Sequence, residues 1–152
     1  SNPYTGALAI FASRLLNDKP PLVFEDGRQM RDFVSAHDVA RAVRLAIESP
    51  HCGQEVFNVA SGRPVSVVEV ARRIAAEMGK DHIAPEITGK CRAGDIRNCI
   101  ADISKARRVL GYEPRVSLEE GVKELAAWLA GKSSVDRLMH AREELAVRGL
   151  TT

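Results

Sequence analysis

The residues best suited to bind an anionic ligand are arginines in two separate polar segments. The first segment contains Arg31 followed by Asp32, and the second is a glycine-containing, basic loop that carries Lys90 and Arg92. An arginine makes paired hydrogen bonds to a phosphate, and an adjacent carboxylate can hold its guanidinium in place. The loop would suit a flap that closes over a phosphate. A surface ion pair at the entrance of a strand is the alternative for Arg31 and Asp32.

These segments require a scaffold, and hydrophobic spacing with capping residues predicts one of alternating strands and helices. Serines followed three residues later by an acidic side chain predict three helix starts, at Ser35, Ser66 and Ser117. Helices are expected over 6–17, 36–49, 66–78, 105–110, 117–129 and 134–148. Strands are expected at 22–24, around 33–34, over 55–59 and near 86–88. The alternation of strands and helices indicates an α/β fold with parallel pairing.

The helix over 36–49 carries apolar residues at helical spacing, including Val39, Val43 and Ile47. Asn58 falls near the end of the strand expected over 55–59, where side chains of an α/β layer point into the ligand crevice. Asparagine also satisfies the backbone of a local turn, and that second role stays open for Asn58.

Three motifs occur in an order that resembles a known family. They are Arg31-Asp32-Phe33-Val34 before a helix that contains Asp38, then Phe57-Asn58-Val59-Ala60, then Arg92-Ala93-Gly94-Asp95 with the later Gly111-Tyr112-Glu113-Pro114. This order is similar to that of the extended short-chain dehydrogenases that act on nucleoside-diphosphate sugars, such as UDP-glucose 4-epimerases and dTDP-glucose 4,6-dehydratases. The resemblance covers the carboxy-terminal half of that architecture. It implies an α/β fold, with a small parallel or mixed sheet and flanking helices, from the C-terminal part of an extended Rossmann-type enzyme.

The resemblance also implies a role for individual residues. Phe24 would stack on the nucleotide base, with a stabilisation of about 1–3 kcal/mol, and backbone groups beside it, including those of Leu22, would meet the base edge. A core position in an edge strand is the alternative for Phe24. Arg31, Asn58 and Arg92 would bind the diphosphate, and Asp95 would accept hydrogen bonds from the ribose hydroxyls. Ala93 departs from the more common proline at that position of the motif.

Two motifs of the complete family are missing from the sequence. A dinucleotide site needs closely spaced glycines, but the closest pair here, Gly89 and Gly94, is five residues apart. The family's Tyr-x-x-x-Lys pair is also missing, because Leu8 follows Tyr4 and Val116 follows Tyr112 at that spacing. The sequence therefore predicts no catalytic residues and no NAD bound by this chain alone, although intact relatives use NAD.

Composition is typical of a globular protein. The 152 residues are 45% hydrophobic and 28% charged, and the formal net charge of +2 gives little reason to expect nucleic-acid binding. No apolar run is long enough to span a membrane, and no signal segment opens the chain, so the cytoplasm is expected. Cys52, Cys91 and Cys99 favour reduced thiols over disulfides. A zinc site from Cys91, Cys99 and His82 is disfavoured because the short ligand spacing is lacking.

We therefore expect residues 1–152 to form a nucleotide-sugar-binding domain without the dinucleotide-binding domain. Residues 1–132 would be the family-like region, and residues 133–152 a C-terminal amphipathic helix. The chain would be a fragment, a truncated reading frame or half of a split protein, and its protein partner a second copy or the missing Rossmann half. The alternative is a non-catalytic interaction module that keeps the fold for stability. A nucleic-acid module is a more distant alternative.

Overall fold

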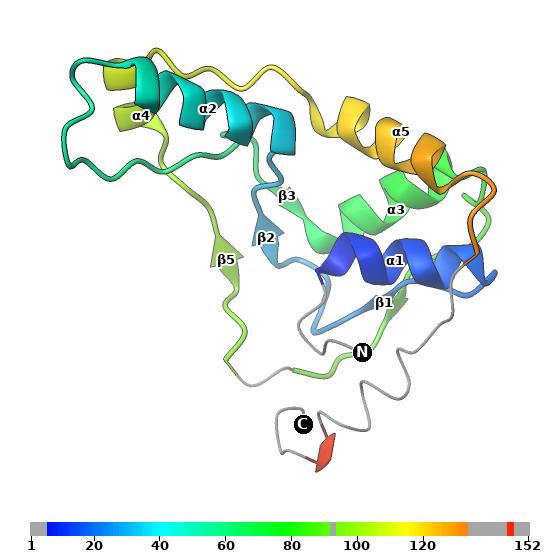
Figure 1. The fold of residues 1–152 in the computed structure, drawn as a ribbon. Helices are drawn as coiled ribbons and strands as arrows, with labels where there is room; N and C mark the ends of the chain where they lie inside the picture. Colours follow the sequence, from blue (N-terminus) through cyan, green and yellow to red (C-terminus); the bar gives the residue numbers. More distant parts are fainter. Residues whose placement is uncertain (1–5, 92–93, 134–145, 148–152) are drawn as a thin grey trace. The chain divides into compact units, whose positions relative to one another are not determined.

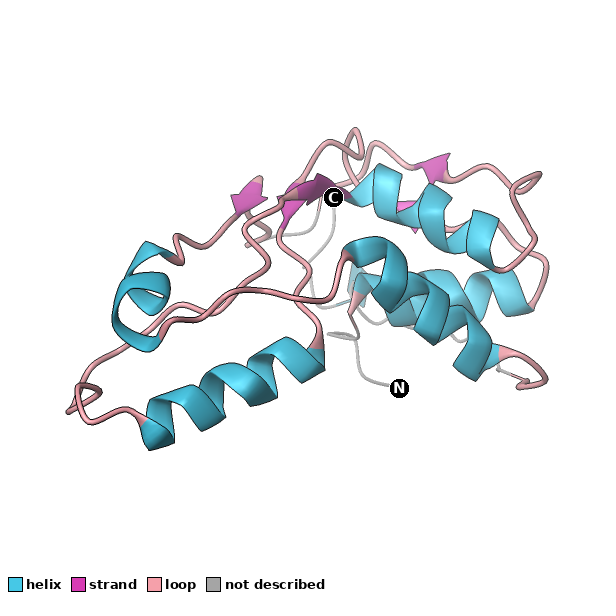
Figure 2. Ribbon diagram, turned by 90° about the horizontal axis from the view of Figure 1, so that it is seen from above, coloured by secondary structure: helices cyan, strands magenta, loops and turns pink. Residues whose placement is uncertain are grey.

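The computed structural model describes residues 6–91, 94–133 and 146–147 of the chain (Figure 1). Its helices are α1 (Ala7–Leu16), α2 (Ala36–Glu48), α3 (Val67–Glu77), α4 (Ser104–Leu110) and α5 (Leu118–Leu129). Its strands are β1 (Leu22–Val23), β2 (Met30–Arg31), β3 (Val65–Ser66), β4 (Glu86–Ile87) and β5 (Asn98–Cys99). The strands are short, and loops join them to the longer helices (Figure 2). The helix expected over 134–148 falls almost entirely outside the described residues.

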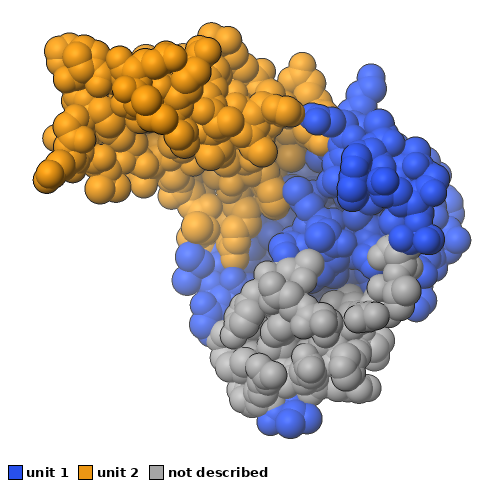
Figure 3. Space-filling view, in the orientation of Figure 1, with its two compact units in different colours: residues 1–29, 66–97, 122–152 blue, residues 30–65, 98–121 orange. Residues whose placement is uncertain are grey.

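The chain divides into two compact units (Figure 3). The first unit contains residues 1–29, 66–97 and 122–152, and the second contains residues 30–65 and 98–121. Each unit contains a parallel strand pair, as the alternation of strands and helices predicts. In the first unit β1 pairs with β4, and in the second unit β2 pairs with β5.

The core of the first unit forms where α1 packs against α3. Both helices bury one apolar face because their hydrophobic residues recur every three or four positions. The fully buried side chains include Leu15 from α1, Val70 and Ile74 from α3 and Val23 from β1. The Lys80 ammonium donates to the carbonyl of Leu15, at 2.6 Å, so α1 also has a polar partner at its C-terminal end.

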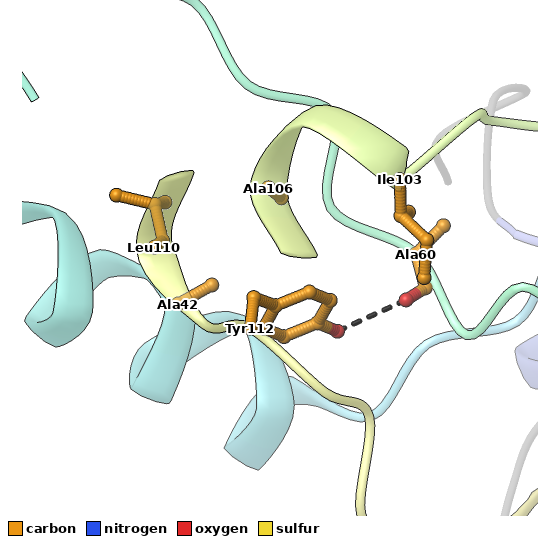
Figure 4. Packing of buried hydrophobic residues seen from close by; sticks show 6 residues of the cluster. All are labelled: Ala42, Ala60, Ile103, Ala106, Leu110 and Tyr112. Atoms are coloured by element: carbon orange, nitrogen blue, oxygen red, sulfur yellow. Dashed lines mark hydrogen bonds between the residues drawn. The ribbon is translucent and has the colours of Figure 1, made fainter. Parts of the chain in front are cut away.

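The core of the second unit gathers around Tyr112 (Figure 4). Its other buried members come from α2, from α4 and its N-cap residue, and from the segment after residue 57, namely Ala42, Ala60, Ile103, Ala106 and Leu110. The Tyr112 hydroxyl donates to the carbonyl of Ala60 at 2.9 Å, so the ring is buried and its polar end is satisfied. Burial and the nearby Asp38 carboxylate raise the pKa of Tyr112. Gly111 ends α4 in the left-handed conformation, with φ 64°, as the Gly-Tyr-Glu-Pro motif predicts.

Two expected strands are wrong. Pairing occurs at Met30–Arg31 instead of residues 33–34, and β3 is the other neighbour of β2 in the strand order. Residues 55–59 form no strand, because a strand needs a paired neighbour and the polar groups of this segment have other partners. The Val56 carbonyl accepts a hydrogen bond from the Lys105 ammonium at 2.9 Å.

The helix starts were better predicted than the faces that the helices bury. The reciprocal capping box at Ser117 and Glu120 is confirmed, with hydrogen bonds of 2.8 and 3.2 Å. Helix α2 begins as expected, but its apolar residues Val39, Val43 and Ile47 are 37%, 55% and 80% exposed. The face of α2 that is buried instead carries Asp38 and Ala42.

Candidate functional site

In the first unit, a turn and a loop that are distant in sequence are joined by backbone hydrogen bonds. The amide of Thr88 donates to Val23 at 2.9 Å, and Glu25 donates to Lys90 at 2.9 Å and accepts from Gly89 at 3.2 Å. These bonds extend the β1–β4 pairing beyond the strand ends. The loop that carries the predicted ligand residues therefore starts directly beside the turn after β1.

The same turn also holds the other end of this loop. Arg97 makes two parallel hydrogen bonds of 2.7 Å to the two carboxylate oxygens of Asp26, and a third of 3.2 Å to Glu25. A guanidinium and a carboxylate match in this paired geometry, which makes the contact stronger and more directional than a single ion pair. The hydrogen bonds from the Arg97 side chain and from the Arg28 backbone lower the pKa of Asp26 to about 2. Asp26 therefore remains ionised at neutral pH.

Gly27 fixes the shape of this turn. It has a φ of 76°, and a Cβ there would lie 3.0 Å from Val68 Cβ and 3.1 Å from side-chain atoms of Val23 and Ile87. The Gly27 carbonyl accepts a hydrogen bond from the Val68 amide at 3.1 Å, at the start of α3. Only glycine fits here without displacing neighbours, so the turn is held against the core.

Phe24 and Leu22 precede the turn. Phe24 is half-buried, and its carbonyl accepts hydrogen bonds from Gln29 Nε2 at 3.0 Å and from the Gly27 amide at 3.2 Å. Gln29 is buried, and within the described residues its Oε1 atom lacks a hydrogen-bond partner. The carbonyls of Pro21 and Val23 face β4, so the backbone groups of Leu22 point to the opposite edge of β1. The role of Leu22 at a base edge stays a prediction.

Asp95 belongs to the same loop as Arg97. Its side chain is exposed and accepts a hydrogen bond from the amide of Ile96 at 3.0 Å. Asp95 and Phe24 each lie two residues from a partner of the Arg97–Asp26 pair, within about 7 Å of it along the chain. The Arg97–Asp26 pair thus joins the segments that carry the residues expected to meet the base and the ribose. Arg92 lies outside the described residues.

The remaining predicted ligand residues belong to the second unit. Arg31 is half-buried in β2, and its Nη1 donates to the carbonyl of Met30 at 2.9 Å. Asn58 is exposed, and its Nδ2 donates to the carbonyl of Asp102 at 3.3 Å, a residue 44 positions later and not part of a local turn. The functions of Arg31 and Asn58 in ligand binding stay predictions.

Asp32 has a different partner from the one expected. One of its carboxylate oxygens accepts from the amide and hydroxyl of Ser61, at 2.8 and 2.5 Å, and the other accepts from the amide of Gly62 at 2.9 Å. The interpretation that Asp32 holds Arg31 in place is therefore replaced by one in which Asp32 holds the turn after Asn58. Backbone amides in a turn bind a carboxylate well. Almost any residue type can supply such an amide, so the sequence did not indicate this contact.

Asp38 is another polar residue whose role the sequence did not indicate. It is 2% exposed, and it accepts hydrogen bonds of 3.0 Å from the backbone amides of Arg115 and Val116 and one of 2.6 Å from Arg41. Ser35 caps α2 by accepting from the amide of His37, so Asp38 forms no reciprocal capping box with it. Burial alone would raise the pKa of Asp38, but these hydrogen bonds outweigh it and lower the pKa.

Neither a metal site nor a membrane-spanning helix occurs among the described residues. They contain no group of three or more histidines, cysteines and carboxylates that could hold a metal ion. Cys91 and Cys99 are exposed and Cys52 is half-buried, and all three are free thiols. Among the helices of the described part of the chain, none has the length and apolar character needed to cross a membrane.

The parallel strand pairs and flanking helices are those of an α/β protein. Its structural neighbours are Rossmann-type epimerases and dehydratases, which it matches over their C-terminal part. A family model described as GDP-mannose 4,6 dehydratase matches residues 5–125. The chain belongs to this family, which lies among the NAD-dependent epimerases and dehydratases of the extended short-chain dehydrogenases. The predicted family and fold class are both confirmed.

Individual relatives give the same result. A dTDP-L-rhamnose 4-epimerase of Burkholderia thailandensis is 39% identical over 131 residues, which cover 86% of this chain and 35% of the relative. A putative UDP-glucose 4-epimerase of Methanocaldococcus jannaschii is 36% identical over 124 residues, which cover 82% of this chain and 39% of the relative.

Solved structures are similar over the same extent. The UDP-glucose 4-epimerase of Thermotoga maritima, determined with UDP-glucose, has a TM-score of 0.75 and 39% identity, covering 85% of this chain and 41% of that one. The UDP-N-acetylglucosamine 4-epimerase of Methanobrevibacter ruminantium, in complex with UDP-N-acetylmuramic acid, has a TM-score of 0.76 and 30% identity, with coverages of 86% and 41%. The chain spans about two fifths of the length of these relatives.

Proposed function

We propose that this chain is the nucleoside-diphosphate-sugar-binding part of an NAD-dependent epimerase or dehydratase and is not catalytic on its own. The proposal rests most on one observation: the Arg97–Asp26 pair brings the loop with Asp95 to the turn that follows Phe24. The first unit then supplies an aromatic face, the outward backbone of Leu22 and a carboxylate for the nucleoside. Arg31, Asn58 and Arg92 are proposed for the diphosphate.

The residues present do not fit a bound dinucleotide. The sequence has no closely spaced glycines that would let the backbone approach a pyrophosphate, and it has no Tyr-x-x-x-Lys pair. We therefore derive no hydride or proton transfer for this chain, and we expect no turnover of UDP-glucose when NAD is added. Turnover by the purified 152-residue chain, with rates above those of a mock purification, would contradict this part of the proposal.

Binding is tested by calorimetric titration of the chain with UDP-glucose, dTDP-L-rhamnose and GDP-mannose, whose bases and sugars differ. Each charge-assisted arginine contact contributes roughly 1.5–3 kcal/mol, so Arg31→Ala or Arg92→Ala should weaken nucleotide-sugar binding about tenfold or more. Uridine, which has no phosphate, should bind these variants and the parent equally. Arg72→Ala is the matched control, because it removes an exposed guanidinium from α3.

The outcomes separate two functions. Binding of at least one nucleotide sugar, weakened in both arginine variants, supports the proposal. No binding to any of them would favour a non-catalytic interaction module, for which the exposed Val43 and Ile47 of α2 provide an apolar surface. The proposed protein partner is a second copy of the chain or a dinucleotide-binding half, and the proposed compartment is the cytoplasm.

A further inference from the structure

The Arg97–Asp26 pair differs from a single solvated ion pair because its contact is two-pronged and includes a second carboxylate. Both nitrogens of the guanidinium end, Nη1 and Nη2, contact separate oxygens of Asp26 at 2.7 Å, and Nη1 also lies 3.2 Å from Glu25. Holding one arginine against two carboxylates restricts three side chains at once. An exposed single pair contributes little, but a paired contact within a network fixes the geometry of the groups that carry it.

The backbone on both sides of this contact is also fixed. Glu25 exchanges hydrogen bonds with Lys90 and Gly89, and Gly27 has no room for a side chain. The turn is therefore a rigid reference to which Arg97 attaches the far end of the loop. Residues 88–90 are held by backbone bonds at the near end, so the loop is anchored twice.

We propose that Arg97 is a positioning residue that, through Asp26, fixes the Asp95 carboxylate relative to the Phe24 ring. This inference rests on the proposed function, because it assigns Asp95 to the ribose and Phe24 to the base. Arg97 itself contacts no part of the ligand in this arrangement, since its guanidinium is committed to Asp26 and Glu25. Its effect is to set the distance at which one ligand meets both residues.

The contact itself is tested first, without a ligand, by amide hydrogen exchange in the 152-residue chain. Arg97→Ala and Asp26→Asn should each speed exchange of the Gly89 and Ile96 amides about fivefold, because the loop then opens more often. The amide of Lys80, which donates to Ala75 at 2.8 Å in the same unit, serves as an internal control. Equal exchange in the parent and both variants would overturn the inference.

The positioning role is tested by titrating UDP and 2′-deoxy-UDP. In the parent, loss of the 2′-hydroxyl should weaken binding about tenfold, as for a hydrogen bond to a charged group. In Arg97→Ala this difference should fall below about threefold, because Asp95 is no longer held in place. The swapped double variant Asp26→Arg with Arg97→Asp should restore the difference, and Arg72→Ala should leave it unchanged.

The outcomes distinguish failure of the inference from failure of the proposed function. If the parent does not bind UDP, the proposed function fails, and the positioning role fails with it, whatever the exchange data show about the loop. If the parent binds UDP and Arg97→Ala weakens binding while keeping the full 2′-hydroxyl difference, Arg97 contacts the ligand directly and the inference is wrong. Unchanged binding in Arg97→Ala would also refute it.

Discussion

Asp38 provides the sharpest test of how the second unit is held together. Its carboxylate is 2% exposed, and it accepts from the Arg115 and Val116 amides and from Arg41. Asp38→Asn keeps the shape of the side chain, but the new NH2 group then faces the backbone amides and the guanidinium that donated to the carboxylate, and donors cannot bond to one another. Removing one partner of a buried charged contact costs about 3–5 kcal/mol, so we expect a loss of that size in the free energy of unfolding.

Urea denaturation followed by circular dichroism measures this loss at pH 7. Glu48→Gln is the matched control, because Glu48 is in the same helix and pairs with Arg44 at 3.7 Å, with both side chains at least 60% exposed. That control should change the free energy of unfolding by less than about 0.5 kcal/mol. If Asp38→Asn changes stability no more than Glu48→Gln, the buried acceptor does not stabilise the unit.

The pH dependence gives an independent check with a defined sign. Because folding lowers the pKa of Asp38, its contribution is complete above the unfolded pKa of about 3.9 and is lost as the pH falls through the folded value. The gap in stability between the parent and Asp38→Asn should therefore be largest near neutral pH and shrink below about pH 4. A gap that is constant from pH 7 to pH 3 would refute the argument.

Three other substitutions follow from the described contacts. Gly27→Ala should lower the free energy of unfolding by about 2–4 kcal/mol, because of its positive φ and contacts near 3.0 Å; a change below about 0.5 kcal/mol in urea denaturation would contradict this. Tyr112→Phe should cost about 1–2 kcal/mol by the same assay, since it leaves the buried Ala60 carbonyl without its donor, and a neutral result would show that water replaces the hydroxyl. Val43→Lys should reduce self-association in light scattering with little effect on stability, because Val43 is 55% exposed on α2; a parent that stays monomeric at high concentration would refute this.

The helices could be predicted well because the features that specify them are local. Ser117 and Glu120 lie within one helical turn, and the side chain of each accepts a hydrogen bond from the backbone amide of the other. Gly111 ends α4 because glycine adopts the left-handed conformation without strain. The strands were predicted less well, since a strand exists only with a neighbour. Residues 55–59 have a strand-like sequence, yet the Val56 carbonyl binds a lysine instead.

The buried faces were harder to predict than the helices because hydrophobicity alone does not determine burial. In α2 the apolar Ile47 is 80% exposed, whereas the charged Asp38 is 2% exposed. A carboxylate is buried when donors satisfy it, and here the donors come from residues 77 and 78 positions later. The chain also spans only about two fifths of its relatives, so an apolar face such as that of α2 need not have its partner within these residues.

The same distinction divides the residues of the candidate site. Arg31, Asn58 and Asp95 were predicted because each belongs to a short motif that can be recognised without knowing its spatial neighbours, and Phe24 was predicted from its position in the family resemblance. Arg97 was not predicted, since its partner Asp26 is 71 residues away and an arginine near a loop is common. The residues proposed to touch a ligand were recognised by resemblance to a family, whereas Arg97, proposed to orient one of them, depends on a contact distant in sequence. Substitution of Arg97 therefore tests a positioning role that the motifs alone do not predict.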